Sequence, residues 1–344
     1  MKKTKGSQIF PAFALVFLVS CQLFESPDRF EARQTEKLLG VKVQIFPDPQ
    51  GLEGFDEVPP GAPALQFTVR AQALTGPEPE DSSTRRWSVE ARAPDGSIYE
   101  GYSGWDAEEK VIKDSRFDSE STRQFYGYDP QDVYIGKRAD ALIKPDLFFP
   151  DIGSHGMAPY HFAMDSQGMV HLIVADVNVP QHNLDVYWVI GDPSSGRWRS
   201  AWLVDRRGFT SSSHPWTASW ADKVNVLWNW CDLSINKTAP GMGIFYLQWD
   251  PAGFGRKVRV VEGVPDSWDA AVDPDSGRLL LAYSDANGVY ITSREEGYSW
   301  TRPTPLDASL KRDYPVSVTS DANGTFIVRV RSDTNTREWV VRPR

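Results

Sequence analysis

One short pattern recurs four times in the second half of the chain. Each copy has a short apolar strand, a turn rich in Asp and often Gly, a second strand and a closing Asp. The copies occupy residues 160–176, 216–232, 268–285 and 315–333. Their equivalent positions stand 54, 55 and 47 residues apart, at Val170, Val224, Leu279 and Phe326. A fixed period of this length indicates a fold assembled from similar units.

Each copy is followed by a third strand-like run, and a fourth run fits after most of them. The third runs cover residues 185–190, 243–249, 288–293 and 337–341. Four antiparallel strands in each 40–50 residues form the blade of a β-propeller. The pattern therefore predicts an all-β fold, a β-propeller of four-stranded antiparallel blades. About 300 residues, divided by about 50 for each blade, suggest about six blades.

The region 41–154 has the same β character but a weaker pattern. Residues 87–102, with 133–137 as a third strand, could be an early blade. The alternative is a separate immunoglobulin-like β-sandwich. The last repeat lacks a fourth strand, and an early strand from 41–46 or 65–70 could complete its sheet. Such a pairing would close the ring and cover an exposed sheet edge.

One turn carries a family signature. Ser293, Glu295, Gly297 and Trp300 follow the third strand of the third repeat. They resemble the Asp-box, or BNR repeat, of sialidase-like propellers, Ser-x-Asp-x-Gly-x-x-Trp, with Glu295 at the Asp position. The resemblance implies a hairpin turn whose acidic residue bonds turn amides and whose Trp packs between sheets. It supports the fold and implies no catalytic role for these residues.

The amino-terminal segment predicts export and a lipid anchor. Basic residues within 1–5 precede an apolar run, 9–20, which is too short to span a bilayer. Leu18-Val19-Ser20-Cys21 resembles the lipobox of bacterial lipoproteins. The resemblance implies cleavage before Cys21 and acylation of that residue. Gln22, rather than Asp, follows it, which favours the outer membrane. An ordinary secretory signal is the alternative.

Composition limits the partners that we expect. The full chain has a net charge of -9, and residues 1–20 contribute three lysines and no acidic residue. The remaining 34 basic and 46 acidic residues give -12, which offers no electrostatic footprint for nucleic acid. Membrane contact would then depend on the lipid. After Cys21 the chain has a single further cysteine, Cys231, so we expect no internal disulfide.

These observations predict four regions. Residues 1–20 are the lipoprotein signal peptide, 21–40 a tether, 41–154 the N-terminal β region and 155–344 the propeller blades.

The repeat alignment places a set of candidate binding residues on one face of the ring. One group lies where the innermost strands begin: Tyr160, His161, His214, Trp216, Trp268, Asp269 and Tyr314. Another follows the second strands: Asp176, Asp232 and Asp285. Aromatic rings stack on sugar faces, and carboxylates accept hydrogen bonds from hydroxyl groups. The alternative is structural, since Asp after a strand commonly caps a turn and Trp commonly packs in a core.

The sequence gives no reason to expect a metal or another cofactor. Five histidines lie between positions 155 and 214, but no pair has the spacing of a known metal motif. His171 is expected to pack within its strand. No catalytic residue is assigned.

Three functions remain open. The first is a non-catalytic module, held on the membrane by lipid, that binds a glycan, peptide or protein partner. The second is a sialidase-like glycoside hydrolase, although the family's Phe/Tyr-Arg-Ile-Pro motif and an assignable Arg triad are missing. A carboxylate pair from Asp176, Asp269 or Asp285 could serve another glycosidase mechanism. The third is an envelope assembly scaffold.

Overall fold

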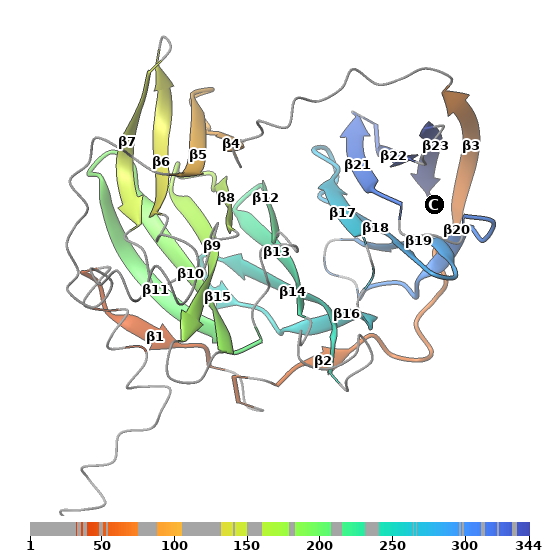
Figure 1. Ribbon diagram of the computed structural model, residues 1–344, viewed down its shortest axis with the longest axis horizontal. Helices are drawn as coiled ribbons and strands as arrows, with labels where there is room; N and C mark the ends of the chain where they lie inside the picture. Colours follow the sequence, from red (N-terminus) through yellow and green to blue (C-terminus); the bar gives the residue numbers. More distant parts are fainter. Residues whose placement is uncertain are drawn as a thin grey trace, which may run out of the picture.

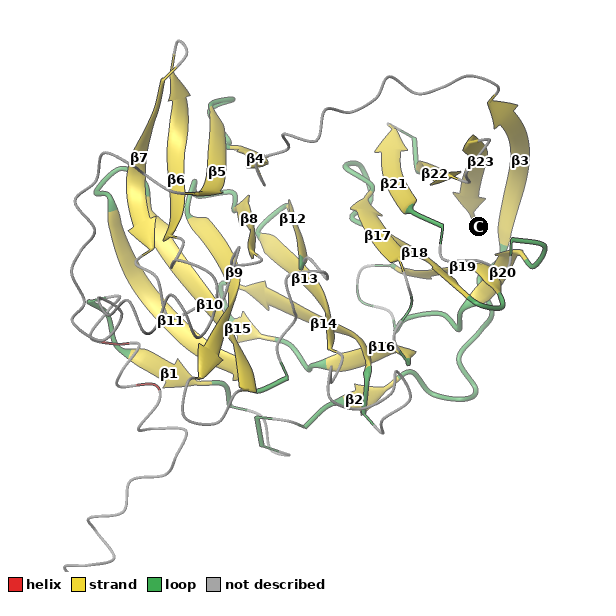
Figure 2. Cartoon of the chain, viewed as in Figure 1, coloured by secondary structure: helices red, strands yellow, loops and turns green. Residues whose placement is uncertain are grey.

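A computed structural model describes most of the β-rich part of this chain. The described residues are 32, 36, 40–47, 51–52, 54–74, 88–104, 132–139, 142–149, 160–178, 183–207, 215–230, 241–263, 265, 267–295, 297, 299–310, 314–321, 323–331 and 336–344. Every element with defined bounds in this part is a β-strand, and the helical residues among those described are Ala32 and Glu36 (Figures 1 and 2). The described residues contain no helix long and apolar enough to cross a membrane.

The strands form five sheets, each built on four antiparallel strands. Sheet 1 contains β4 (Ser88–Arg92), β5 (Ile98–Gly104), β6 (Asp132–Ala139) and β7 (Leu142–Phe149). Sheet 2 contains β8 (Tyr160–Met164), β9 (Val170–Asn178), β10 (Asn183–Asp192) and β11 (Arg197–Asp205). Sheet 3 contains β12 (Trp216–Trp220), β13 (Lys223–Trp230), β14 (Gly243–Asp250) and β16 (Val258–Glu262), with β15 (Gly253–Phe254) paired to β14.

The last two sheets follow the same plan. Sheet 4 contains β17 (Ser267–Val272), β18 (Leu279–Asp285), β19 (Gly288–Arg294) and β20 (Thr304–Asp307). Sheet 5 contains β21 (Val316–Asp321), β22 (Thr325–Arg331), β23 (Thr336–Pro343) and β3 (Phe67–Leu74). The outer strand of sheet 5 thus comes from near the amino end, and β3 pairs antiparallel to β23 along its whole length. β3 therefore supplies the fourth strand of the last sheet, as we expected of residues 65–70 from the repeat pattern.

The sheets stand side by side around an axis, with their first strands innermost (Figure 1). Each first strand contacts the next along the series β4, β8, β12, β17 and β21. Consecutive four-stranded meanders with adjacent inner strands are the architecture of a β-propeller. We call the end at which the inner strands begin the upper face.

Residues 43–47, 51–52 and 54–74 run around the outside of the propeller, and we call them the N-terminal strap. Its strand β1 (Val43–Ile45) adds parallel to β11, and β2 (Asp56–Glu57) adds parallel to β16. A parallel bridge then joins Ala64 to Arg302 beside sheet 4, and β3 completes sheet 5. The strap therefore contacts sheets 2, 3, 4 and 5 in chain order. This use of the first strands explains why five sheets, rather than about six, account for the described residues.

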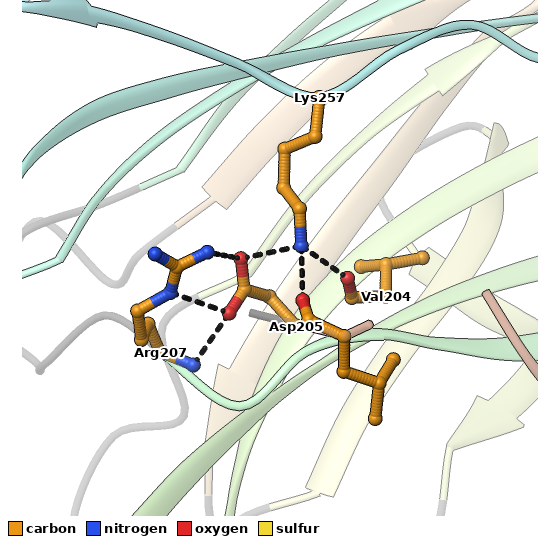
Figure 3. Close-up of polar contacts among 5 residues, drawn as sticks. Val204, Asp205, Arg207 and Lys257 are labelled. Atoms are coloured by element: carbon orange, nitrogen blue, oxygen red, sulfur yellow. Dashed lines mark hydrogen bonds and ion pairs between the residues drawn. The ribbon is translucent and has the colours of Figure 1, made fainter. Parts of the chain in front are cut away.

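A buried ionic cluster fastens the strap to sheets 2 and 3 (Figure 3). The ammonium group of Lys257 donates to the carbonyl oxygens of Leu52 and Val204 and, at 2.8 Å, to Asp205 Oδ2. Arg207 donates to both carboxylate oxygens of Asp205, at 3.0 and 2.9 Å. Lys257 and Asp205 are fully buried. Because all three ammonium hydrogens have acceptors, the buried charge is compensated.

The apolar core lies between neighbouring sheets. One cluster joins sheets 1, 2 and 3, a second joins sheets 3 and 4, and a third joins sheets 4 and 5. Strands alternate sides to supply them: in β18, Leu279, Leu281 and Tyr283 face sheet 3, whereas Leu280 and Ala282 face sheet 5. Neighbouring sheets cover both faces of this sheet, which explains why its strands are almost continuously apolar.

Candidate functional site

Four aromatic rings gather at the upper end of the contact between sheets 3 and 4. Trp268, Tyr283 and Tyr290 are direct cross-strand neighbours on β17, β18 and β19, so they share one face of sheet 4. The rings of Tyr283 and Tyr290 stack with centroids 5.3 Å apart and an interplanar angle of 17°. Trp216, from sheet 3, packs on the same apolar cluster. We call these four residues the upper aromatic cluster.

The cluster is partly open to solvent. Tyr283 is buried, whereas Trp216, Trp268 and Tyr290 are half-buried. Burial raises the pKa of Tyr283 well above its usual value, with smaller effects from Asp285 and Tyr290. The Tyr283 hydroxyl therefore stays protonated and can act as a hydrogen-bond donor over the whole physiological pH range.

The hairpin that carries Tyr283 and Tyr290 is fixed by Asp285. Its Oδ1 accepts hydrogen bonds from the backbone N–H groups of Asn287, at 2.7 Å, and Gly288, at 3.2 Å. Gly288 has φ +151°, and an added Cβ would lie 2.8 Å from the carbonyl oxygen of Asp307. Asp285 thus caps a turn, as the structural alternative for the Asp residues predicted. It nevertheless lies next to the upper aromatic cluster.

Asn229 lies on the same side of sheet 3 and was missed by the sequence reasoning. It stands two residues beyond Leu227, which pairs with Trp216 on β12. Residues two apart in a strand share a face, so Asn229 is a diagonal neighbour of Trp216. Its exposed fraction is 3%. Within the described part of the chain, its Oδ1 has no hydrogen-bond partner. Asn229 lies in a strand rich in Trp and apolar residues, so the sequence pattern did not indicate a separate role for its side chain.

His161 and Asp269 connect inner strands. The Nδ1 of His161 lies 2.6 Å from Thr217 Oγ1 and accepts from the Thr217 N–H at 3.2 Å. Asp269 Oδ2 accepts from the Val318 N–H at 2.7 Å, and its Oδ1 accepts from the Ala270 N–H. Burial raises the pKa of Asp269 to about 6, against the lowering effect of the two backbone N–H donors. Asp269 points away from the upper aromatic cluster, toward sheet 5.

The structure places the other predicted site residues away from the upper aromatic cluster or does not describe them. Tyr160 is buried in the core around sheet 2, on the opposite face of β8 from His161, and Tyr314 packs against the core between sheets 4 and 5. Of the four inner-strand aromatics, Trp216 and Trp268 are therefore brought together. Asp176 lies on β9 opposite Asp185, and its side chain is outside the described atoms. Cys21, Cys231, His214 and Asp232 fall outside the described residues.

His171 serves the core of sheet 2, as its strand position predicted. Its Nε2 bonds to Asp165 Oδ2 at 3.1 Å, and its Nδ1 accepts from the indole N–H of Trp188 at 3.1 Å. Burial lowers the pKa of His171, with Asp165 acting in the opposite direction. A neutral ring that accepts from Trp188 is consistent with a structural role.

The turn with the Asp-box pattern has the geometry that the resemblance implies at Gly297 and Trp300, but not at Glu295. Gly297 has φ +78°, and Trp300 is buried between sheets 3 and 4 in edge contact with Tyr246. Both features fit the resemblance. Glu295 instead lies at the surface and pairs with Arg278 at 2.9 Å.

No group of three or more His, Cys, Asp and Glu side chains suited to a metal ion occurs among the described residues.

Comparisons with known proteins give distant structural likenesses. No family model matches the chain, and no curated protein matches it. The β-propeller domain of the Trilobed protease from Pyrococcus furiosus is 12% identical over 82% of this chain and 83% of its own, with a TM-score of 0.41. The Aleuria aurantia lectin, solved as a mutant with α-methyl-L-fucoside, is 16% identical over 71% and 70%, at 0.38. A prolyl endopeptidase is 14% identical, at 0.37, over 71% of this chain.

This chain spans about a third, 32%, of that endopeptidase. All three TM-scores are below 0.5, so the propeller assignment rests on the sheet order and the adjacent inner strands.

Proposed function

We propose that this chain is a lipid-anchored bacterial envelope protein whose propeller binds a glycan, without catalysis, at the upper aromatic cluster. The observation that carries the proposal is the gathering of Trp216, Trp268, Tyr283 and Tyr290 at one end of two adjacent sheets. Half-buried rings with a phenol donor match the apolar faces and hydroxyl groups of a sugar. The anchor through Cys21, and an outer-membrane location, belong to the proposal on the strength of the lipobox resemblance.

Binding without catalysis is the function that the polar groups support best. Asp285 accepts two turn N–H groups, and Asp269 accepts two backbone N–H groups on the other face of β17. Asp285 is held in the turn through its Oδ1, and Asp269 faces away from the aromatic rings. The acidic net charge also favours neutral over anionic sugars.

The test is binding of the acylated protein to a panel of neutral methyl glycosides, measured by saturation-transfer NMR and titration calorimetry. Trp268→Ala should weaken binding at least tenfold, because a stacking ring is lost. Trp220→Ala is the matched control. Trp220 is a half-buried Trp on the same strand as Trp216, at the opposite end, with its indole N–H bonded to the Pro274 carbonyl at 3.1 Å. Equal loss of binding in both folded variants would contradict the proposal.

Glycoside hydrolysis is a second candidate because of one observation. Asp269 has a pKa raised to about 6, in the range of a general acid. A panel of 4-methylumbelliferyl glycosides tests this function directly. Turnover by the native protein that disappears in Asp269→Asn would favour hydrolysis over binding alone.

A further inference from the structure

We propose that Asn229 is the specificity-determining acceptor of the upper aromatic cluster, and that its Oδ1 receives a hydrogen bond from a hydroxyl group of the bound sugar. This inference rests on the proposed function and adds the residue that would distinguish one sugar from another. The first evidence for it is the burial of Asn229 and the hydrogen bonding of its Oδ1. Asn229 has an exposed fraction of 3%, and Oδ1 lacks a hydrogen-bond partner within the described structure.

A second asparagine on the same strand shows what a structural role looks like. Asn225 lies four residues earlier on β13, faces the same side of sheet 3 and is equally buried, at 2%. Its Oδ1 accepts from the Tyr246 hydroxyl at 2.6 Å and from Gln248 Nε2 at 3.3 Å. The two residues share type, strand, face and burial. They differ in that the Asn225 oxygen has two donors, whereas the Asn229 oxygen has none among the residues that the structure describes.

The position of Asn229 associates it with the aromatic rings. Its cross-strand partner Ile244 belongs to the apolar cluster between sheets 3 and 4. Its diagonal neighbour Trp216 packs on that cluster, as do Trp268 and Tyr290. Asn229 is closer than Leu227 to the upper end of the strand. The register therefore places Asn229 on the face of sheet 3, and at the end of β13, to which the half-buried rings belong.

An unpartnered buried oxygen weakens the unliganded fold, since a carbonyl removed from water without a donor loses its hydration. A ligand hydroxyl would restore the missing bond. The same oxygen would then discriminate against a sugar that lacks the hydroxyl, because the acceptor would remain unpaired in that complex. Sugar stacking on the rings supplies affinity, and Asn229 supplies selectivity.

The first arm of the test is thermal stability without ligand. The Leu side chain has the same branched arrangement of heavy atoms as Asn and no polar atoms, so Asn229→Leu should leave the melting temperature unchanged or raise it by a few degrees. The matched variant Asn225→Leu should lower it by roughly 2–8 °C, because the Tyr246 hydroxyl loses its acceptor. If Asn229→Leu lowers the melting temperature as much as Asn225→Leu does, Oδ1 has a structural partner and the proposal is overturned.

The second arm is selectivity, measured with the best methyl glycoside of the panel and its series of monodeoxy analogues. The native protein should bind one deoxy analogue about tenfold more weakly than its parent, and Asn229→Leu should bind the two equally. Selectivity that persists in Asn229→Leu would overturn the inference while leaving the glycan site intact. Failure of every glycoside to bind would overturn the proposed function, and with it the ligand role of Asn229, whatever the melting temperatures are.

Discussion

His161 and Asp269 occupy equivalent positions in two sheets and make equivalent contacts. Each lies on an innermost strand, and each accepts a hydrogen bond from a backbone N–H of the next innermost strand, from Thr217 and from Val318. The inner edges of neighbouring propeller sheets have N–H groups that no ladder satisfies. A side-chain acceptor at this repeat position connects one sheet to the next. The two residues therefore differ in chemistry but share a place in the fold.

Asp269 should make the stability of the protein depend on pH. Its pKa is about 6 in the folded state, above the ordinary value of 3.8, so the folded state binds more protons between these values. The free energy of unfolding should therefore fall as pH rises from about 4 to about 6, by at most about 3 kcal/mol, and then level off. Denaturant unfolding of the native protein and Asp269→Asn at pH 4–8 measures this as the difference between the two curves.

His171 must be separated from this effect because its lowered pKa acts in the opposite direction. The folded state disfavours a charged His171, so the stability that this group contributes is complete above its ordinary pKa of 6.5 and is lost as pH falls below that value. Subtracting the Asp269→Asn curve cancels the His171 contribution. A difference that stays constant from pH 4 to pH 8 would show that Asp269 does not titrate as expected.

Much of the fold could be predicted because the repeat is a local pattern. The positions Val170, Val224, Leu279 and Phe326 all fall at or near the start of a second strand. The supply of an outer strand to sheet 5 from early residues was also foreseen, since an open edge is unfavourable. The additions of β1 and β2 to other sheets were not foreseen. Two- and three-residue parallel pairings leave no periodic signal.

The candidate site was harder to predict from sequence, for physical reasons. The repeat identified Trp216 and Trp268, which do share one cluster, but it could not say which face of a strand each neighbour occupies. Tyr283 and Tyr290 joined the cluster through cross-strand register. Asn229 stands out through a missing partner, a property of three-dimensional packing that no sequence pattern records.

Acylation of Cys21 should determine where the protein resides. Cys21→Ser removes the thiol that would carry the diacylglycerol, so the protein should leave the membrane fraction. Detergent phase partitioning after expression in a bacterium, with mass spectrometry of the amino-terminal peptide, measures this. Cys231→Ser is the control and should stay in the detergent phase. Detergent partitioning of Cys21→Ser equal to that of the native protein would contradict lipid anchoring at this residue.

Lys257 should be the residue on which attachment of the strap most depends. Lys257→Met keeps the aliphatic length but leaves the carbonyl oxygens of Leu52 and Val204 without a donor and Asp205 with one cation fewer. Removal of one partner from a buried ion cluster should reduce the free energy of unfolding by about 3–5 kcal/mol. Hydrogen exchange should accelerate first at the Phe46 and Asp56 amides, which bond to Leu203 and Lys257.

The adjacent Arg256 provides the control for Lys257. Its guanidinium pairs with Asp56 at 2.9 Å, and both side chains are about half exposed. Arg256→Met should change the free energy of unfolding by less than about 1 kcal/mol, because water screens an exposed pair. Similar effects of the two substitutions would mean that the buried cluster is not what holds the strap.

Gly277 and Trp220 should be energetically coupled across the lower end of the contact between sheets 3 and 4. Gly277 has φ +71°, and an added Cβ would lie 2.4 Å from the Trp220 ring. Gly277→Ala should therefore reduce the free energy of unfolding by about 2–4 kcal/mol, from backbone strain and ring displacement together. Gly168, in the matching turn of sheet 2, has φ +79° and open space around it, so Gly168→Ala should cost only about 1–2 kcal/mol.

A double-mutant cycle separates these two contributions. In a Trp220→Ala background the new methyl group has no ring to displace, so Gly277→Ala should then cost no more than Gly168→Ala does. The expected coupling between positions 220 and 277 is about 1–2 kcal/mol. Additive effects of the two substitutions would show that strain at φ +71° alone requires glycine here. In that case Trp220 would stabilise the contact through its own packing and its bond to the Pro274 carbonyl, independently of the turn beneath it.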